Sequence, residues 1–357
     1  MRWYAVAHPG LEQVVADELT AAGLSPGIAA GGVGFEASIE QGARLARTLR
    51  TPDRLLAEVA RGHAPNAEML GGLVRKGNWK AFIHPLATVE IQINSKASKV
   101  HFKESAERRV EHAIKDALKG PRLPEKGGRP RVPQRVQVRI DDDTATVSID
   151  VGGELLHKRG WRADGGGAPL RENLAAAMLR LAKWDGTSTL LDPFCGSGTI
   201  PIEAALMATG RSPFGRRGFA CDEWPGVVAL KRAPDRKPLP MPPIVGADRD
   251  PQALSRALAN AQKAGVDIRW QEIDVADLQA PSAGGTLVTN PPWGVRMAPD
   301  AVASVYGRLG RTVRERFEAW RVVFLAPHPS LAERVHRDAR LLTSFTSGGI
   351  RVGVWGV

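Results

Sequence analysis

Cysteine is scarce in this 357-residue sequence, which contains only Cys195 and Cys221. Two cysteines cannot build the disulfide framework of a small secreted domain, and they cannot supply the four ligands of a cysteine-based zinc site. His8, His63, His84, His101 and His112 show no metal-ligand spacing. We therefore expect no metal, and we expect the reducing cytoplasm as the location.

Long apolar runs are also missing. No stretch of about 18 apolar residues occurs, and no charged segment followed by an apolar one opens the chain, so the sequence predicts neither a membrane span nor secretion. A length of 357 residues is enough for two or three domains, and the hydrophobic fraction of 43% is ample for real cores. The formal net charge of +11 favours an acidic partner, and nucleic acid ranks ahead of an anionic membrane.

Most of the excess positive charge lies in one region. Between Arg75 and Arg139 there are 16 Lys and Arg against 6 Asp and Glu. A charge run can be a solvated helix face, but a surplus this local, with Ser and Asn among the cations, is typical of phosphate contacts. We predict nucleic-acid binding by this region, through Lys96, Lys99, His101, Lys103, Arg108, Arg129 and Arg131.

Hydrophobic periodicity divides the chain near residue 160. The first part alternates short strands with amphipathic helices and ends in a hairpin over 136–150, which predicts small α+β domains. From Thr187 on, strands and helices alternate regularly, a pattern typical of a parallel sheet covered on both faces. The last segments, Leu341–Thr346 and Ile350–Val357, are predicted to form an antiparallel hairpin.

A glycine turn joins the first strand of the second half to its helix. The sequence Asp192-Pro193-Phe194-Cys195-Gly196-Ser197-Gly198-Thr199 offers free backbone N–H groups and close backbone approach to a ligand. The third glycine of the dinucleotide fingerprint is absent, because Pro201 stands in its place and Ile202 follows it, and no Gly-Lys-Ser/Thr phosphate loop occurs. A pyrophosphate ligand is therefore disfavoured.

Polar residues end four successive strands of this half. Asp192 can accept from an ammonium group, directly or through water, Asp248 from ribose hydroxyls, and Asp274 from an adenine amine. Asp250 precedes Pro251 and is interpreted as a helix N-cap instead. With Asn290 ending the fourth strand, the pattern predicts a nucleoside-type cofactor at the carboxyl ends of the strands.

The segment Asn290-Pro291-Pro292-Trp293 follows an apolar strand. The two prolines deny the sheet two donors, so the chain must leave the sheet at Asn290. An amide acceptor beside a stackable indole can grip a planar, amine-bearing ring such as a nucleobase. The simpler interpretation is a strand that ends in a proline turn.

These motifs together resemble known enzymes. The second half looks like the class I S-adenosylmethionine-dependent methyltransferases, and Asn290–Trp293 looks like their amino-methylating motif. The first half resembles a THUMP RNA-binding module behind a ferredoxin-like domain. The segments most similar to the THUMP guanosine-N2 methyltransferases are Ser95–Phe102, Gly153–Arg162, Ala168–Ala175 and Asp192–Glu203, and Phe219–Gly226 resembles an insertion of their 23S rRNA branch.

The resemblance implies an α/β fold that is divided into three domains and a linker. We expect a ferredoxin-like domain at 1–55, a THUMP domain at 56–157, a linker at 158–170, and a Rossmann-like class I methyltransferase domain at 171–357. The last should contain a mostly parallel seven-stranded sheet that ends in the C-terminal antiparallel hairpin.

The resemblance also implies a reaction. The chain would be an enzyme that transfers a methyl group from S-adenosylmethionine to the N2 amine of a guanosine in RNA, most similar to the 23S rRNA branch, without a metal and as a monomer. A tRNA guanosine-N2 methyltransferase that acts on the acceptor stem is the main alternative. A DNA adenine-N6 methyltransferase and a non-catalytic RNA-binding assembly factor are more distant ones.

Residue roles follow from the matching motifs. The catalytic segment would be Asn290, Pro291, Pro292 and Trp293. The cofactor would contact Asp192, Phe194, Gly196, Ser197, Gly198, Thr199, Asp248, Arg249, Asp274, Val275 and Asn290.

Arg296 and Trp224 keep two interpretations each, whereas Cys195 has one. Arg296 either contacts RNA or forms a surface salt bridge, and Trp224 either lines the RNA path or packs in a core. Cys195, inside the glycine turn, is interpreted as a small packing residue and not as a nucleophile, so Cys195→Ser should retain methyl transfer.

Overall fold

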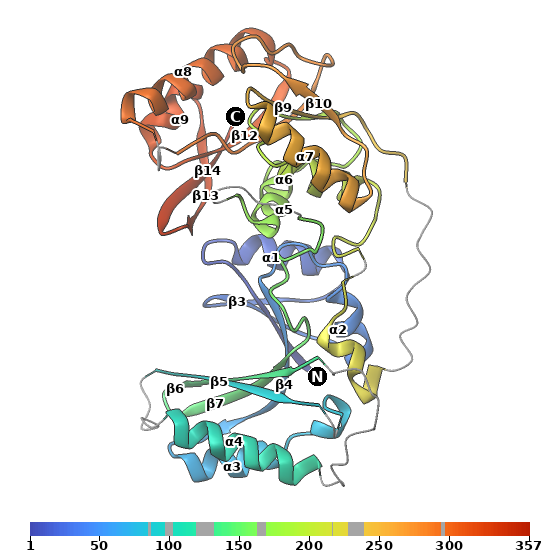
Figure 1. The fold of residues 1–357 in the computed structure, drawn as a ribbon. Helices are drawn as coiled ribbons and strands as arrows, with labels where there is room; N and C mark the ends of the chain where they lie inside the picture. The colour runs from blue at the N-terminus through green and yellow to red at the C-terminus, as the bar shows by residue number, and fades with distance from the viewer. Residues whose placement is uncertain are drawn as a thin grey trace. The chain divides into compact units, whose positions relative to one another are not determined.

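The computed structural model describes residues 1–84, 87–96, 103–118, 132–162, 169–215, 217–227, 239–293 and 297–357. Figure 1 shows the course of the chain, which divides into two compact units. Unit 1 consists of Met1–Val6, Leu19–Leu156 and Gly218–Ala233. Unit 2 consists of Ala7–Glu18, His157–Arg217 and Pro234–Val357. The four-part division expected from the sequence stays a prediction.

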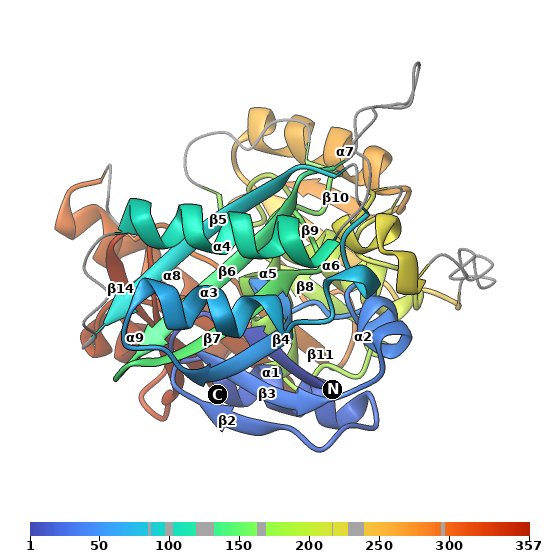
Figure 2. The same cartoon turned by 90° about the horizontal axis from the view of Figure 1, so that it is seen from below.

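Unit 1 is built on a seven-stranded sheet of order β2-β3-β1-β4-β7-β6-β5. The strands are β1 (Arg2–Val6), β2 (Gly27–Ala29), β3 (Gly32–Glu36), β4 (Arg54–His63), β5 (Val89–Lys96), β6 (Gln134–Asp141) and β7 (Thr144–Asp150). The helical segments are α2 (Ile39–Leu45), α3 (Ala67–Arg75), α4 (Lys103–Leu118), η1 (Trp79–Ala81), η2 (Ala220–Glu223) and η3 (Pro225–Val227). Figure 2 shows α3 and α4 side by side across β5, β6 and β7.

Strand β4 joins the two regions that the sequence assigned to separate N-terminal domains. It pairs with β1 on one side and with β7 on the other, so that Leu56 lies opposite both Tyr4 and Asp150. One continuous sheet therefore spans the regions expected to be the ferredoxin-like domain and the THUMP domain.

The chain returns to unit 1 at Gly218, in the stretch that contains Phe219–Gly226. Trp224 is fully buried there, and its indole Nε1 donates to Gln134 Oε1 at 2.8 Å. Its ring packs edge-on against Phe82, with centroids 5.0 Å apart. Of the two interpretations of Trp224, core packing is confirmed, and a place on the RNA path is wrong because the side chain is not accessible.

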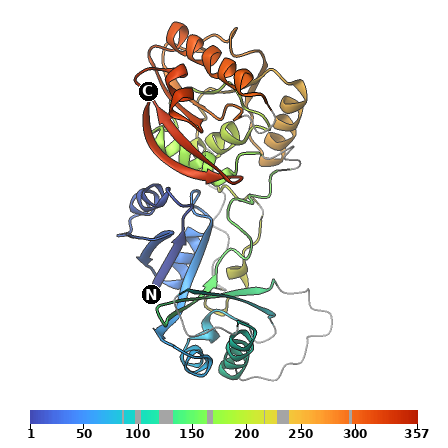
Figure 3. The same ribbon diagram turned by 90° about the vertical axis from the view of Figure 1, so that its left-hand side faces the viewer.

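Unit 2 is built on a sheet of order β10-β9-β8-β11-β12-β14-β13. Its strands are β8 (Leu190–Asp192), β9 (Ile244–Asp248), β10 (Arg269–Glu272), β11 (Gly285–Thr289), β12 (Trp320–Ala326), β13 (Arg340–Ser347) and β14 (Ile350–Gly356). The five neighbouring strands β10, β9, β8, β11 and β12 pair in parallel. Strand β14 pairs antiparallel with both β12 and β13. The mostly parallel seven-stranded sheet with a C-terminal hairpin is confirmed, and Figure 3 shows that hairpin in full length.

Helices cover both faces of this sheet. They are α5 (Glu172–Leu181), α6 (Thr199–Ala208), α7 (Pro251–Ala264), α8 (Pro299–Arg316) and α9 (Pro329–Val335), while α1 (Glu12–Ala21) is shared between the units. Adjacent strand residues point to opposite faces, as β-strand geometry requires. Leu190 and Val288 join the core with α5, α6 and α7, whereas Leu191 and Leu287 join the core with α8 and α9.

Candidate functional site

Four parallel strands end at one edge of the unit 2 sheet. Asp192 is the last residue of β8, Asp248 is the last of β9, and Asn290 directly follows β11. Asp274 lies two residues after Glu272, the last residue of β10. Glu272 pairs with Asp248, so β10 and β9 end side by side. Because these strands are neighbours in the sheet, the structure brings the four predicted strand-end residues to the same edge.

The glycine turn between β8 and α6 has the backbone that its sequence demands. Gly196 and Gly198 have φ angles of 52° and 84°, values that side chains rarely adopt. A Cβ on Gly198 would lie 2.9 Å from the Trp270 ring, whereas a Cβ on Gly196 would meet no atom within 4 Å. The turn thus packs against the protein at Gly198 and leaves open space beside Gly196.

Asp192 is buried beneath this turn. Its Oδ1 accepts from the Thr289 hydroxyl at 2.7 Å and from the Phe194 N–H at 3.1 Å. Burial raises the pKa of Asp192 to about 7, the two hydrogen bonds lower it, and the nearby Asp248 charge raises it further. The carboxyl therefore fixes the end of β8 against β11 and the start of the turn.

Asp248 ties the next strand to the same turn. Its Oδ2 accepts from the Gly196 N–H at 2.9 Å, and its Oδ1 accepts from the Asp250 N–H at 3.0 Å. Asp250 caps α7 by accepting from the Gln252 N–H at 2.9 Å, which confirms its assignment as an N-cap. Asp248 is partly exposed and is thus accessible to a ligand.

Asp274 stands at the start of the loop that follows β10. The Arg249 guanidinium lies 4.0 Å from Asp274 Oδ2, so two predicted cofactor residues are close together. Val275 is buried. Ser197 and Thr199 are also buried, whereas Phe194 is partly exposed.

Two arginines that the sequence did not single out support this site. Arg162 donates to the Glu172 carboxylate at 2.9 Å, to Ser197 Oγ at 3.3 Å and to Thr199 Oγ1 at 3.1 Å. Arg308, on α8, donates from Nη1 to both oxygens of Asp274, at 3.2 and 3.0 Å. Arg162 could have been found from the sequence, because it ends the segment Gly153–Arg162 that resembles the THUMP guanosine-N2 methyltransferases. No local sequence pattern marks Arg308.

Asn290 presents an unused acceptor at the same edge. Its Oδ1 is buried and has no hydrogen-bond partner among the described residues. Pro291 is buried, Pro292 is exposed, and Trp293 is partly buried against the core that faces α5, α6 and α7. Buried acceptors are nearly always paired, so the unpaired Asn290 oxygen favours a ligand that carries a donor.

Cys195 does not have the properties of a nucleophile. Its side chain is buried, and burial, together with the charges of Asp192 and Asp248, raises the pKa of its thiol well above the ordinary value. The reactive thiolate is therefore disfavoured. The geometry supports a packing role for Cys195.

The predicted RNA-binding residues are only partly described. Lys96 ends β5 and Arg108 lies on α4, and both are exposed. Lys103 is the first residue of α4. The remaining residues, Lys99, His101, Arg129, Arg131 and Arg296, lie outside the described residues.

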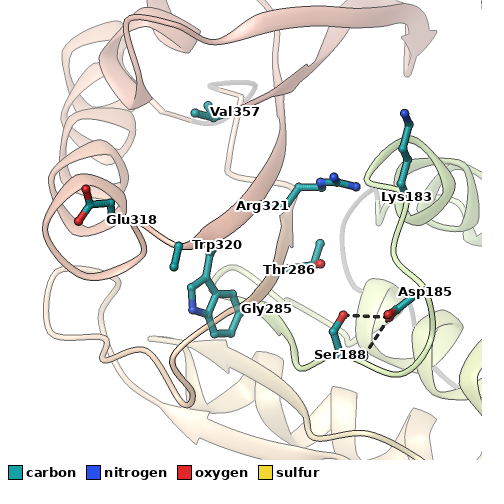
Figure 4. Close-up of a pocket in the computed structure, with 10 residues that line it drawn as sticks. Lys183, Asp185, Ser188, Gly285, Thr286, Glu318, Trp320, Arg321 and Val357 are labelled. Carbon is teal, nitrogen blue, oxygen red and sulfur yellow. Dashed lines mark hydrogen bonds between the residues drawn. The ribbon is translucent and has the colours of Figure 1, made fainter.

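The cleft in Figure 4 lies at the opposite edge of the unit 2 sheet. Its lining includes Gly285 and Thr286 at the start of β11 and Trp320 and Arg321 at the start of β12. Parallel sheets bind ligands at the carboxyl ends of their strands, so this cleft is not the predicted cofactor site.

The described stretches contain neither a candidate membrane span nor a candidate metal site. No helix there has the length and apolar character that a bilayer span requires. No group of three or more His, Cys, Asp and Glu side chains in those stretches is arranged to hold a metal ion.

Comparison with known proteins agrees with this geometry. A model of the RlmL ferredoxin-like domain matches residues 2–56. The ribosomal RNA large subunit methyltransferase K/L of Syntrophotalea carbinolica is 34% identical over 98% of this chain and 52% of the relative. This chain thus spans about half the length of that relative. A putative RNA methyltransferase of Synechocystis sp. is 29% identical over 98% of this chain and 94% of the relative.

A solved structure has the same overall fold. A putative methyltransferase known as SMU.472, complexed with SAH, is 27% identical with a TM-score of 0.87, over 99% of this chain and 97% of that chain. The RMKL-like methyltransferase domain model matches residues 159–345, which include the glycine turn, the strand-end acids and Asn290–Trp293. This chain therefore belongs to the RMKL-like methyltransferase domain family.

Proposed function

We propose that this chain transfers a methyl group from S-adenosylmethionine to the N2 amine of a guanosine in RNA, with 23S rRNA as the substrate. The buried Oδ1 of Asn290, which has no hydrogen-bond partner among the described residues, carries the proposal. It is an acceptor for an amine, and it lies at the sheet edge where Asp192, Asp248 and Asp274 also lie.

The residues at this edge fit the proposed cofactor. Space beside Gly196 allows a ligand to approach the turn, and the partly exposed carboxylates of Asp248 and Asp274 are acceptors for ribose hydroxyls and an adenine amine. Asp192 is nearly inaccessible, which favours a contact with the cofactor ammonium through water. Bound S-adenosylmethionine supplies an electrophilic methyl group.

The protein's part in the transfer is orientation of the amine. Asn290 Oδ1 and the Pro291 carbonyl accept from the two N–H groups of the guanine amine, which aims the nitrogen lone pair at the methyl group. Trp293 stacks on the extruded base. Unstacking a base costs a few kcal/mol, and stacking on an aromatic side chain returns about 1 to 3 kcal/mol.

RNA is favoured as the substrate by the basic region and by the names of the relatives. The Syntrophotalea carbinolica protein is named a ribosomal RNA methyltransferase, and the Synechocystis protein a putative RNA methyltransferase. We assign RNA binding to the region 56–157, as a THUMP domain, and to Arg296. A ribosomal substrate places the reaction in the cytoplasm, where we propose a monomer.

The test combines methyl transfer with cofactor binding. Purified protein is incubated with S-adenosylmethionine carrying a labelled methyl group and with 23S rRNA, tRNA or duplex DNA, and nucleosides are identified by mass spectrometry. We expect N2-methylguanosine in 23S rRNA. Asn290→Ala should lower the rate by roughly a hundredfold or more, because the amine loses its orientation. Its affinity for S-adenosylhomocysteine, measured by calorimetry, should stay near that of wild type.

Cys195→Ser is the matched control at the same edge and should retain most of the rate. Unchanged turnover in Asn290→Ala would contradict the assignment of Asn290. Labelled methyl in tRNA alone would show that the substrate is tRNA and not 23S rRNA. Labelled methyl in duplex DNA alone would favour an adenine-N6 methyltransferase. Cofactor and RNA binding without any methylation would favour an assembly factor.

A further inference from the structure

One face of α8 holds the loop that follows β10. Arg308, Thr312 and Arg316 are four residues apart and therefore lie on the same side of the helix. Thr312 Oγ1 donates to the Val275 carbonyl at 2.9 Å. Arg316 Nη1 donates to the Ala276 and Leu278 carbonyls at 2.8 and 2.9 Å. The three side chains thus fix the loop from Asp274 to Leu278.

Arg308 differs from the other two because it binds a side chain. Its Nη1 lies 3.2 Å from Asp274 Oδ1 and 3.0 Å from Oδ2, and Oδ1 also accepts from the Ala276 N–H at 3.0 Å. Arg308 and Asp274 keep 33% and 25% of their side-chain surface exposed. The carboxylate is thus held from two directions while part of it stays accessible.

We propose that Arg308 is a positioning residue that fixes the Asp274 carboxylate toward the purine 6-position and thereby sets the preference for adenine over a 6-oxo purine. The inference rests on the proposed function, in which Asp274 accepts from the adenine amine. A carboxylate can only accept, so it favours a 6-amino group and repels a 6-oxo group.

Fixed orientation is what makes this preference strong. A 6-oxo purine carries an N–H at the neighbouring ring position, and a mobile carboxylate can turn to accept from it. A carboxylate held by Arg308 and by the Ala276 N–H cannot make this adjustment without losing its own hydrogen bonds. Loss of Arg308 should therefore relax discrimination more than it weakens overall binding.

The experiment measures calorimetric affinities of the full chain for S-adenosylhomocysteine and for its 6-oxo analogue S-inosylhomocysteine. Arg308→Met should reduce the ratio of the two affinities about tenfold, and Arg308→Lys should give an intermediate ratio because a cation remains. The matched control is Arg316→Met, which removes contacts from the same helix face to the same loop but only to backbone carbonyls. It should leave the ratio unchanged.

A double-mutant cycle separates positioning from general support of the loop. In an Asp274→Asn background, Arg308→Met should no longer change the ratio. Equal changes of the ratio in Arg308→Met and Arg316→Met, or a persistent effect without Asp274, would overturn the inference. Wild-type protein that binds neither ligand would overturn the proposed function as well, whereas wild-type binding without discrimination would overturn the Arg308 assignment alone.

Discussion

The Asp192 carboxyl is 1% exposed and lies between two donors, the Thr289 hydroxyl and the Phe194 N–H. Because burial raises its pKa to about 7 from 3.8, the folded protein binds more protons than the unfolded chain between roughly pH 4 and pH 7. The free energy of unfolding therefore falls as the pH rises through that window. Asp192 in its charged form destabilises the fold.

Asp192→Asn should raise the free energy of unfolding at pH 8 by on the order of 2 to 4 kcal/mol and change it little near pH 4. The amide keeps an acceptor for Thr289 and cannot ionise. Urea unfolding at both pH values checks this. Asp185→Asn is the control, and it should lower the free energy of unfolding at pH 8. Hydrogen bonds from Thr187 and Ser188 lower the pKa of the exposed Asp185, so its charged form stabilises the fold. Equal stability of Asp192→Asn and wild type at pH 8 would contradict the prediction.

At the scale of elements, the start of α6 is held by a residue from a distant segment. Arg162 precedes α5 and reaches Ser197 and Thr199 at the glycine turn, while Glu172, 4% exposed, balances its charge. The glycine turn between β8 and α6 is therefore shaped both by its own glycines and by the segment that leads into α5.

Arg162→Met should cost about 3 kcal/mol of stability, because it leaves the buried Glu172 carboxylate without its partner. It should also weaken binding of S-adenosylhomocysteine about tenfold, because the turn loses two hydrogen bonds. Adding Glu172→Gln should restore stability but not affinity. Urea unfolding and calorimetry separate the two effects, and recovery of both in the double variant would show that Arg162 acts only on stability.

At the scale of the whole molecule, unit 1 and unit 2 divide the proposed work. The candidate catalytic edge belongs to unit 2, and the basic region between Arg75 and Arg139 belongs to unit 1. Phosphate contacts contribute RNA affinity that decreases with salt concentration. The proposed amine acceptor, Asn290, contributes instead to the rate of methyl transfer. RNA affinity and methyl transfer should thus respond to different substitutions.

Replacing Lys96 and Arg108 by Ala should weaken RNA binding and reduce the slope of log affinity against log salt by about 1 for each cation removed. Affinities measured at several salt concentrations check this. Arg44→Ala is the control in the same unit, because Arg44 already pairs with Glu40. An unchanged slope in the double variant would exclude both residues from phosphate contact.

Local patterns were sufficient for much of the fold. Consecutive apolar residues, such as Leu190 with Leu191 and Leu287 with Val288, predict strands that are buried on both faces. The structure confirms this, because the two residues of each pair lie in different cores. The glycines of the turn and the acids that follow the strands were also visible in sequence, because a strand end and a positive φ are properties of a few adjacent residues. The short strand β2 and the helix α9 were missed, since each is too short to show a period.

The sequence by itself thus determined the parallel sheet, its hairpin and the edge at which a ligand should bind. Only the tertiary structure decided which side chains support that edge and where Trp224 lies. Arg308 meets Asp274 across 34 residues, and Trp224 meets Gln134 across 90. Periodicity reports which face of an element is buried, but the partner on that face is set by packing between elements distant in sequence.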